Sequence, residues 1–265
     1  MNYVLITGGA NGMGRATALK LAQNGYHVFS CDIKINPEEV ENITQLQVDV
    51  TDMKSIQNAF EFVSSKTDNL CGVINFAGII MMNSLIEISE EDFIKIFNLN
   101  VFGVYRVNKA FFPLVQKGQG RIIITTSELA PNKILPFNAI YAISKKALDA
   151  YAQGLAMELG LLNIPVITLR PGAVETQILK DSSKEMEELN AKTLLYKNTM
   201  PKFKHIVDKE QGGSIPPSKI ADLVLKILNK KKPKFIYKKN VSKKLKLLNL
   251  IPAKLQLKIY KMILK

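Results

Sequence analysis

The sequence predicts an α/β protein with a doubly wound parallel sheet in a single domain. Short apolar runs alternate with stretches of helical periodicity along most of the chain, which is typical of a parallel sheet covered by helices on both faces. Two runs, Val4-Leu5-Ile6 and Ile122-Ile123-Ile124, are apolar throughout, as expected of strands buried on both faces. The 265 residues are 47% hydrophobic and 22% charged, a globular composition that excludes a disordered chain.

The predicted elements follow one another in a regular order. Each strand is predicted from a short apolar run, and each helix from apolar residues at helical spacing. The expected strands span residues 3–7, 27–32, 46–50, 72–76, 121–126, 165–169 and 234–237. The expected helices span residues 13–22, 55–64, 93–115, 139–161 and 217–228. Right-handed crossovers between the strands give the doubly wound arrangement.

The alternation of predicted strands and helices is interrupted between residues 176 and 217. A connection of this length without a strand is more often a lid or a binding loop than a plain link. Met186, Leu189, Thr193 and Leu194 recur at helical spacing and predict a short amphipathic helix. This helix either covers a binding site or packs on the surface of the body.

A glycine-rich segment follows the first predicted strand and opens the first predicted helix. It reads Thr7-Gly8-Gly9-Ala10-Asn11-Gly12-Met13-Gly14. Glycines allow a tight turn and a close approach of backbone N–H groups to a ligand, and a helix N-terminus favours an anion. The segment therefore predicts a site for the pyrophosphate of a dinucleotide.

Asp32 is expected to select the dinucleotide. It ends the second predicted strand about 18 residues after Gly14, where a carboxylate can accept hydrogen bonds from the adenosine ribose hydroxyls. The same carboxylate repels a 2′-phosphate, and no Arg or Lys occurs between Gly8 and Gly14 to attract one. The sequence favours NAD over NADP.

Further motifs lie at the ends of predicted strands and within predicted helices. They are Asp49-Val50, Asn75-Phe76-Ala77-Gly78, Asn98-Leu99-Asn100-Val101, Thr126-Ser127, Tyr141-Ala142-Ile143-Ser144-Lys145 and Pro171-Gly172-Ala173-Val174-Glu175-Thr176. Together with the glycine segment, this ordered set resembles the short-chain dehydrogenase/reductase superfamily, in particular its short single-domain branch with a Tyr-x-x-x-Lys signature. The resemblance covers residues 1–232, and Phe76 departs from the family's Asn-Asn-Ala-Gly.

The resemblance implies a Rossmann-like fold and an oxidoreductase that uses a nicotinamide cofactor, as a homodimer or homotetramer. Its catalytic residues correspond to Tyr141, Lys145, Ser127 and Asn100. In this family pattern Lys145 also binds the nicotinamide ribose, Ser127 holds the substrate oxygen, and Asn100 organises a water relay toward Lys145. The implied cofactor contacts are Gly8, Asn11, Gly12, Met13, Gly14, Asp32, Asp49, Val50, Asn75, Ala77, Gly78, Tyr141, Lys145, Pro171, Gly172, Val174 and Thr176.

Tyr141 and Lys145 are four residues apart and therefore share one face of a helix. A free phenol has a pKa of about 10, and acid/base catalysis at neutral pH favours a lower value. Because a nearby ammonium and an oxidised nicotinamide both stabilise a phenolate, we expect Lys145 and the cofactor together to lower the pKa of Tyr141. Tyr141 would then exchange the hydroxyl proton while a hydride moves between the substrate carbon and NAD.

Two details of the site have alternatives. Ser127 lies fourteen residues before Tyr141, where members of the family commonly show thirteen, so Thr126 competes with Ser127 for the substrate oxygen. His27 and His205 show no metal-ligand spacing, and no metal site is predicted.

The substrate is expected to be a lipophilic secondary alcohol or ketone of steroid, retinoid or fatty type. Residues 79–82 and 129–135 are mostly apolar and are expected beside the site together with the lid, and apolar walls favour a hydrophobic ligand, although such runs also form cores. The alternatives are a non-catalytic NAD-sensing or membrane-tethered binding protein and a dehydratase or epimerase. We therefore expect an NAD(P)-binding catalytic domain at 1–237, with a substrate lid at about 176–216, and a basic amphipathic tail at 238–265.

The positive charge is concentrated in that tail and the helix before it. The chain has a net charge of +13, yet residues 223–265 contain 14 lysines and no Asp, Glu or Arg. Lys254, Lys258, Lys261 and Lys265 form one stripe on a helix expected after Pro252, with apolar residues around much of the rest. The tail is expected either to contact an anionic membrane or to pack on the body or on a second subunit.

Other partners and compartments are less favoured by the sequence. Nucleic-acid binding is unlikely because the tail has no Arg and few aromatic residues. The chain has only two cysteines, Cys31 and Cys71, and no apolar run of the roughly 18 residues that a membrane span needs. We expect a cytoplasmic protein, which is peripheral to a membrane in the alternative where the tail contacts one.

Overall fold

The computed structural model describes residues 2–210 and 213–264, and its sheet confirms the predicted fold class. In the described residues, seven strands form one parallel sheet in the order β3-β2-β1-β4-β5-β6-β7. The strands are β1 (Asn2–Thr7), β2 (Tyr26–Asp32), β3 (Ile43–Gln47), β4 (Gly72–Asn75), β5 (Arg121–Thr125), β6 (Val166–Pro171) and β7 (Ile236–Lys239). The strand order reverses between the adjacent β1 and β4, which creates a crevice at their carboxyl ends.

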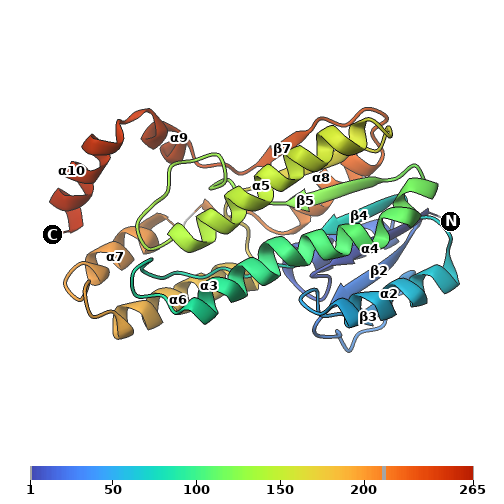
Figure 1. Cartoon of the computed structure of the whole chain (residues 1–265), viewed down its shortest axis with the longest axis horizontal. Coiled ribbons are helices and arrows are strands. Elements are labelled where there is room, and N and C mark those ends of the chain that lie inside the picture. The colour runs from blue at the N-terminus through green and yellow to red at the C-terminus, as the bar shows by residue number, and fades with distance from the viewer. Residues whose placement is uncertain (1, 211–212, 265) are drawn as a thin grey trace.

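Helices cover both faces of the sheet (Figure 1). In chain order, the described helices are α1 (Gly12–Ala22), α2 (Met53–Lys66), α3 (Glu90–Phe97), the π-helix η1 (Asn98–Gly103), α4 (Val104–Lys117), α5 (Ala139–Gly160), α6 (Gln177–Lys192), α7 (Met200–Glu210), α8 (Ser218–Leu228), α9 (Lys243–Leu250) and α10 (Ala253–Leu264). Alternate residues of β1 enter different cores: Leu5 packs with α2, α4 and α5, whereas Val4 and Ile6 pack with α1 and α8. This two-sided burial explains why the strand sequence is apolar throughout.

Two predicted elements near the site are displaced or broken. The third strand spans Ile43–Gln47 and not 46–50, because its pairing with β2 ends where Gln47 meets Asp32. Residues 48–50 therefore continue into the loop beyond the strand. The long helix expected at 93–115 is divided by η1, where the Asn100 side chain hydrogen-bonds to the backbone of Ile79. Apolar periodicity does not reveal such a local change of helix type.

The region expected to form a lid contains two helices, α6 and α7, and not one short helix. Met186 and Leu189 are buried, as helical spacing requires, in a third apolar cluster. Leu194 is 76% exposed because α6 has already ended at Lys192. Residues 211 and 212 of the expected lid lie outside the described residues.

The tail forms two helices after β7, which extends to Lys239. Helix α10 lies against α7, at the opposite end of the molecule from the N-terminus (Figure 1). Lys265, the last member of the expected lysine stripe, lies outside the described residues. Within the described part of the chain, no helix has the length and apolar character needed to cross a membrane.

Candidate active site

The carboxyl ends of the central strands open into two adjoining cavities. The first, which we call the glycine-loop cavity, lies between the β1–α1 turn, the end of β2 and the loop after β3. The second, which we call the tyrosine cleft, lies between the β5–α5 and β6–α6 connections. The two share part of their lining, namely Met13, Phe76, Gly78, Ile79 and Thr176. The two cavities therefore adjoin each other across the switch point of the sheet.

The glycine turn fits tightly against the sheet. Gly8 has a φ of +71°, and a Cβ there would lie 2.8 Å from the backbone N of Ala77. A Cβ on Gly14 would lie 1.9 Å from the carbonyl O of Gly8. These positions accept only glycine without rearrangement. The turn consequently brings the start of α1 to the edge of the cavity.

The N-terminus of α1 fits an anionic group. Its N-cap, Asn11, makes no side-chain capping bond, and the first turn contains no acidic residue. The first backbone N–H groups of a helix have no partner within that helix, and the helix dipole adds positive potential at this end. Gly12, Met13 and Gly14 line the cavity at this point. This end of the space therefore suits the pyrophosphate of a dinucleotide.

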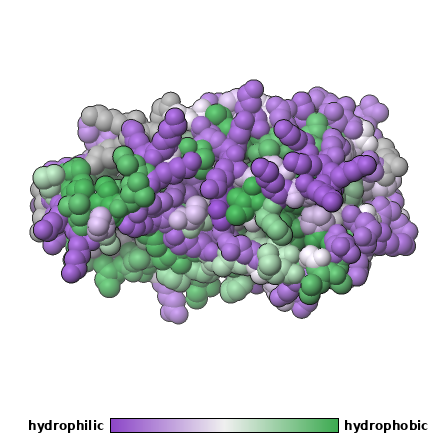
Figure 2. Space-filling model, turned by 90° about the horizontal axis from the view of Figure 1, so that it is seen from above, coloured by the Kyte–Doolittle hydropathy of each residue, from purple (hydrophilic) through white to green (hydrophobic). Residues whose placement is uncertain are grey.

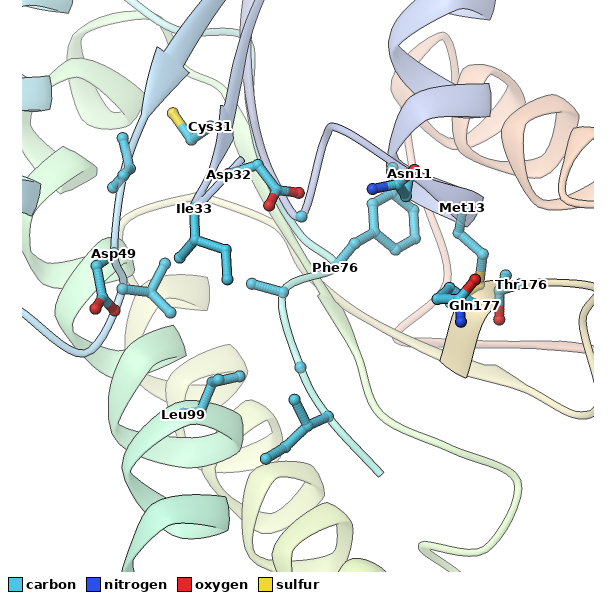
Figure 3. Close-up of a pocket in the computed structure, with 18 residues that line it drawn as sticks. Asn11, Met13, Cys31, Asp32, Ile33, Asp49, Phe76, Leu99, Thr176 and Gln177 are labelled. Carbon is cyan, nitrogen blue, oxygen red and sulfur yellow. The ribbon is translucent and has the colours of Figure 1, made fainter. Parts of the chain in front are cut away.

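Asp32 lies at the other side of the glycine turn. Its carboxylate accepts hydrogen bonds from the backbone N of Ala10 at 3.0 Å and of Lys34 at 3.2 Å. Figure 3 shows the carboxylate directed toward the turn that carries Asn11. The described lining of the glycine-loop cavity contains no Arg or Lys. Arg15, in the first turns of α1, is instead paired with Glu38 at 2.8 Å.

The remaining wall of this cavity includes the loop after β3, the π-helix η1 and the start of α6. Val48, Asp49 and Val50 line it, and the Asp49 carboxylate accepts hydrogen bonds from the backbone N and the hydroxyl of Thr51. Sequence reasoning did not assign several other lining residues to the cofactor, namely Cys31, Ile33, Val48, Phe76, Ile79, Leu99 and Gln177, although it placed Ile79 in the substrate wall. Phe76 carried a signal, since it departs from the family's Asn-Asn-Ala-Gly at the second position. Its ring faces the space between Asp32 and Met13 (Figure 3).

Tyr141, Ser127 and Lys145 meet in the tyrosine cleft. Tyr141 and Lys145 occupy the first two turns of α5, and Ser127 follows the end of β5. A side-chain hydrogen bond joins Ser127 to Tyr141. The Lys145 Nζ donates to the carbonyl O of Thr125 at 3.3 Å and lies 5.8 Å from the centroid of the Tyr141 ring. Helix spacing thus places the phenol and the amine beside each other.

The protonation of this group differs from the expectation. Burial raises the pKa of Tyr141 to about 12, and the hydrogen bond from Ser127 lowers it only in part. Burial also lowers the pKa of Lys145 to about 8. The cofactor-free chain therefore does not show the lowering expected from Lys145 together with an oxidised nicotinamide, because loss of hydration destabilises the phenolate more than the site stabilises it. At neutral pH the phenol carries its proton. For the cofactor-bound chain the lowering stays a prediction.

Thr126 and Ser127 point in different directions. The Thr126 hydroxyl lies 3.2 Å from Oδ1 of Asp149, which is itself held by Arg170 in a buried ion pair. The Ser127 hydroxyl accepts a hydrogen bond from the backbone N of Leu129 and faces Tyr141. Of the two alternatives, the geometry favours Ser127 as the hydroxyl that faces a ligand in the cleft.

Asn100 lies behind the lining of the cleft. Its Oδ1 accepts from the backbone N of Ile79 at 2.8 Å, and its Nδ2 donates to the Ile79 O and to the Ser144 hydroxyl. A Cβ on Gly78 would lie 3.1 Å from Oδ1 of Asn100 and 3.5 Å from Nζ of Lys145. Asn100 thus holds the wall formed by Gly78 and Ile79. Because Gly78 has no side chain, the side chains of Asn100 and Lys145 both approach it closely.

Asn75 lines neither cavity. Its Nδ2 donates to Oδ1 of Asn108 at 2.9 Å beneath the end of β4. All the other expected cofactor-contact residues line one or both cavities. In the tyrosine cleft, sequence reasoning did not assign Glu128 or Asn138, which also line it. Burial raises the pKa of Glu128, and its carboxylate accepts a hydrogen bond from the backbone N of Ser242 in the tail.

The comparison with known proteins agrees with this geometry. A family model described as short chain dehydrogenase matches residues 2–187. The chain belongs to the short-chain dehydrogenase family. It is thus an oxidoreductase of this family, in which a small-molecule substrate and a nicotinamide cofactor are expected.

Several relatives of this short-chain dehydrogenase have lipid-related names. A 3-ketodihydrosphingosine reductase of Bacteroides thetaiotaomicron is 29% identical over 232 residues, which cover 88% of this chain and 85% of that protein. The NADPH-dependent 1-acyldihydroxyacetone phosphate reductase of Schizosaccharomyces pombe is 35% identical over 183 residues, which cover 66% of this chain and 61% of that protein.

Solved structures share the fold at lower identity. The 3-ketoacyl-(acyl-carrier-protein) reductase from Brucella melitensis, complexed with NADH, has a TM-score of 0.73 and 20% identity, covering 89% of this chain and 96% of that chain. An alcohol dehydrogenase from Thermococcus sibiricus, complexed with 5-hydroxy-NADP, has a TM-score of 0.69 and 24% identity, covering 90% of this chain and 96% of that chain. This likeness describes the architecture alone.

Proposed function

We propose that this short-chain dehydrogenase transfers a hydride between NAD(H) and a lipophilic secondary alcohol or ketone. The observation that carries the proposal is the pair of adjoining cavities, one at the glycine turn and the other at the Tyr141, Ser127 and Lys145 side chains. It supports a dinucleotide lying across the switch point with its reactive end near the phenol. The role of each residue follows from its position in these cavities.

Tyr141 is the proposed proton donor and acceptor. A bound nicotinamide supplies or accepts the hydride. In the reducing direction, the Tyr141 hydroxyl gives its proton to the substrate oxygen as the carbonyl carbon becomes a carbinol, and in the oxidising direction the proton returns. The raised pKa keeps Tyr141 protonated and ready to donate. Ser127 donates a hydrogen bond to the same oxygen, which orients the substrate and stabilises negative charge on it.

Lys145 and Asn100 are proposed to support Tyr141. The Lys145 amine, held by the Thr125 carbonyl, is close enough to add positive charge beside the phenol. Asn100 supports the wall around Gly78 and is proposed to order water near Lys145, so that a proton lost by Tyr141 is replaced from solvent. The other lining residues, and Asn75 behind them, are proposed to hold the dinucleotide.

NAD is the proposed cofactor because of Asp32. Its carboxylate lies at the cavity wall where the ribose of the adenosine is expected. A 2′-phosphate would meet this negative charge without a cation in the described lining, since Arg15 is engaged by Glu38. These charges support NAD over NADP, although the Schizosaccharomyces pombe relative is named as NADPH-dependent.

A lipophilic substrate is proposed from the walls beyond Tyr141. Ile79, Ile80 and Leu129 line the cleft. A mostly apolar groove of about 400 Å³ lies under α10, beside the tyrosine cleft. Its lining includes Phe137 and Ala139. Asn138, between those two residues, lines the tyrosine cleft. One short segment thus separates the two spaces, and the groove suits the hydrocarbon part of a substrate whose oxygen lies at Tyr141.

The organisation of the chain is proposed on the same basis. Residues 1–237 form the catalytic domain, the segment at about 176–216 acts as the substrate lid, and residues 238–265 form the tail. We also propose a homodimer or homotetramer in the cytoplasm. The free thiols of Cys31 and Cys71 are compatible with that reducing compartment.

The test uses the purified full chain with NADH or NADPH and a panel of lipid ketones, sugars and short ketones. Absorbance at about 340 nm reports cofactor oxidation, since hydride transfer consumes the reduced nicotinamide. We expect turnover with NADH and long-chain ketones. A strong preference for sugars would remove the lipophilic substrate, and binding of NADH without turnover of any substrate would favour a cofactor-binding protein.

A further inference from the structure

The tail exposes apolar and basic side chains together. We call the outward side of α9 and α10 the tail surface. Its apolar members include Leu250, 79% exposed, and Met262, 78% exposed. We define the tail surface by the exposed residues Leu247, Leu250, Leu255, Met262 and Ile263, with Lys243, Lys246, Lys254, Lys258 and Lys261. No acidic residue occurs in α9 or α10.

Other residues of the tail hold it to the body. Leu264 is buried in an apolar cluster with residues of α6 and α7. Gln256 joins the two tail helices to each other, since it hydrogen-bonds to the carbonyl groups of Leu248 and Ile251 at the α9–α10 turn. The backbone N of Ser242 donates to Glu128, and that of Lys133 donates to Asn249 at 2.8 Å. The tail therefore packs on the body through its inner face, which leaves the tail surface unused by the fold.

We propose that the tail surface docks on an anionic lipid bilayer. A helix that carries lysines beside exposed apolar side chains inserts the latter at the level of the headgroups, while the lysines meet negative lipid charge. Each lysine near such a surface adds to the attraction. The residues before 223 are nearly neutral, so the attraction is confined to the end of the chain that carries the lysines.

The distribution of side chains favours a bilayer over other occupants. Figure 2 views the molecule from the side on which α9 and α10 lie in Figure 1, and hydrophobic side chains gather at its left end beside hydrophilic ones. Two copies of the tail surface that faced each other would bring lysines against lysines. A nucleic acid would leave the exposed leucines and Met262 without apolar contacts. An anionic bilayer satisfies both the charge and the apolar side chains.

Docking has a consequence for the substrate, which rests on the proposed function. Gln256, Leu257 and Tyr260 of α10 form one wall of the groove beside the tyrosine cleft. The hydroxyl of Tyr260 is buried without a hydrogen-bond partner among the described residues. Because the same helix carries the tail surface and lines the groove, docking would place the groove next to the bilayer that holds a lipophilic substrate.

The test is flotation of the full chain with lipid vesicles. We expect binding to vesicles of phosphatidylcholine mixed with phosphatidylglycerol, and little binding to phosphatidylcholine alone. Combined Lys254→Glu, Lys258→Glu and Lys261→Glu should weaken binding at least roughly a hundredfold, because three attractive charges become repulsive. Met262→Glu should weaken it by about tenfold or more, since a charge replaces an apolar side chain at the interface.

Matched controls lie on α2, on the body. Lys54→Glu reverses one charge and Met53→Glu changes a methionine that is 51% exposed, and neither should alter flotation. Thermal unfolding and NADH binding confirm that every variant is folded. The proposal would be overturned if the chain bound neutral and anionic vesicles equally, if it bound neither, or if the tail variants bound as well as the parent chain. It would also be overturned if the tail variants changed dimerisation without lipid, or binding to RNA, and left vesicle binding unchanged. Since flotation measures no turnover, it stands apart from the test of the proposed reaction.

Discussion

The two ends of the active-site space are built in different ways. The glycine-loop cavity is formed by strand ends, a turn and a helix N-terminus, and backbone contacts within β1, α1 and β2 fix its shape. The far side of the tyrosine cleft and the adjoining groove are bounded by loops, the lid and α10, which meet through side chains. The first end depends on local geometry, and the second depends on packing between distant segments. We therefore expect changes at the first end to affect any cofactor-dependent reaction and changes at the second to affect substrate choice.

The largest effect is expected where the backbone of the first end has no spare room. Gly14→Ala places a Cβ 1.9 Å from the Gly8 carbonyl, so α1 must move away from the turn. We expect a loss of stability of about 3 kcal/mol or more and loss of measurable NADH binding. Thermal denaturation and fluorescence titration with NADH report these two changes.

Gly154→Ala is the matched control on α5. A Cβ there meets no atom within 4 Å, and alanine in a helix interior is favoured over glycine by about 1 kcal/mol. The control should therefore be as stable as the parent chain or slightly more stable, and should bind NADH normally. Equal behaviour of the two variants would contradict the tight turn.

The second prediction concerns the buried amine at the centre of the site. Lys145→Met should raise the free energy of unfolding at neutral pH by roughly 1–3 kcal/mol, while turnover is lost. The reason is that burial lowers the folded-state pKa of Lys145 to about 8, below the 10.5 of the unfolded chain. Below pH 8 the folded chain thus carries the full cost of the buried charge. Between pH 8 and 10.5 the folded amine is neutral while the unfolded one is still charged, so that cost fades.

The stability gain from Lys145→Met should therefore shrink as the pH rises from 8 toward 10.5. Denaturant unfolding of both proteins at several pH values measures it. A variant that is less stable than the parent chain at neutral pH, or a gain that grows with pH, would show that the Lys145 amine is stabilised in the fold and not penalised.

The third and smallest effect concerns cofactor choice at the first end. Asp32→Asn keeps an acceptor for the Ala10 N–H but removes the negative charge. We expect the ratio of kcat/KM for NADH to that for NADPH to fall by roughly tenfold, equivalent to about 1.4 kcal/mol. The same ketone substrate is used in both assays. An unchanged ratio would mean that the Asp32 charge does not discriminate between the cofactors.

The same contrast explains how much the sequence revealed. The alternation of strands and helices, the glycine turn and the pairing of Tyr141 with Lys145 follow from local spacing, and the structure places the turn and this pair around two adjoining cavities. The end of β3 was misplaced because apolar character continues through Val48 and Val50 after pairing with β2 has ended. The position of Asn75 behind the cavity, and the contact of Glu128 with Ser242, depend on segments far apart in the chain.

The raised pKa of Tyr141 has the same origin. Spacing on a helix shows that the phenol and the amine are neighbours, but burial of both groups depends on the complete fold. Desolvation then reverses the direction expected from the charge pair alone. An oxidised nicotinamide bound in this cleft would add positive charge beside the phenol, so the protonation of Tyr141 is expected to depend on the occupancy and redox state of the cofactor.

The most direct test of the central claim is Tyr141→Phe, measured as single-turnover oxidation of NADH with a lipid ketone. Phenylalanine keeps the ring that packs beside Lys145 and removes only the hydroxyl. We predict that NADH binding stays within about threefold and that the rate falls by roughly 10²- to 10⁴-fold, the usual contribution of a general acid. A rate within about tenfold of the parent chain, with NADH still bound, would contradict the assignment of Tyr141 as the proton donor.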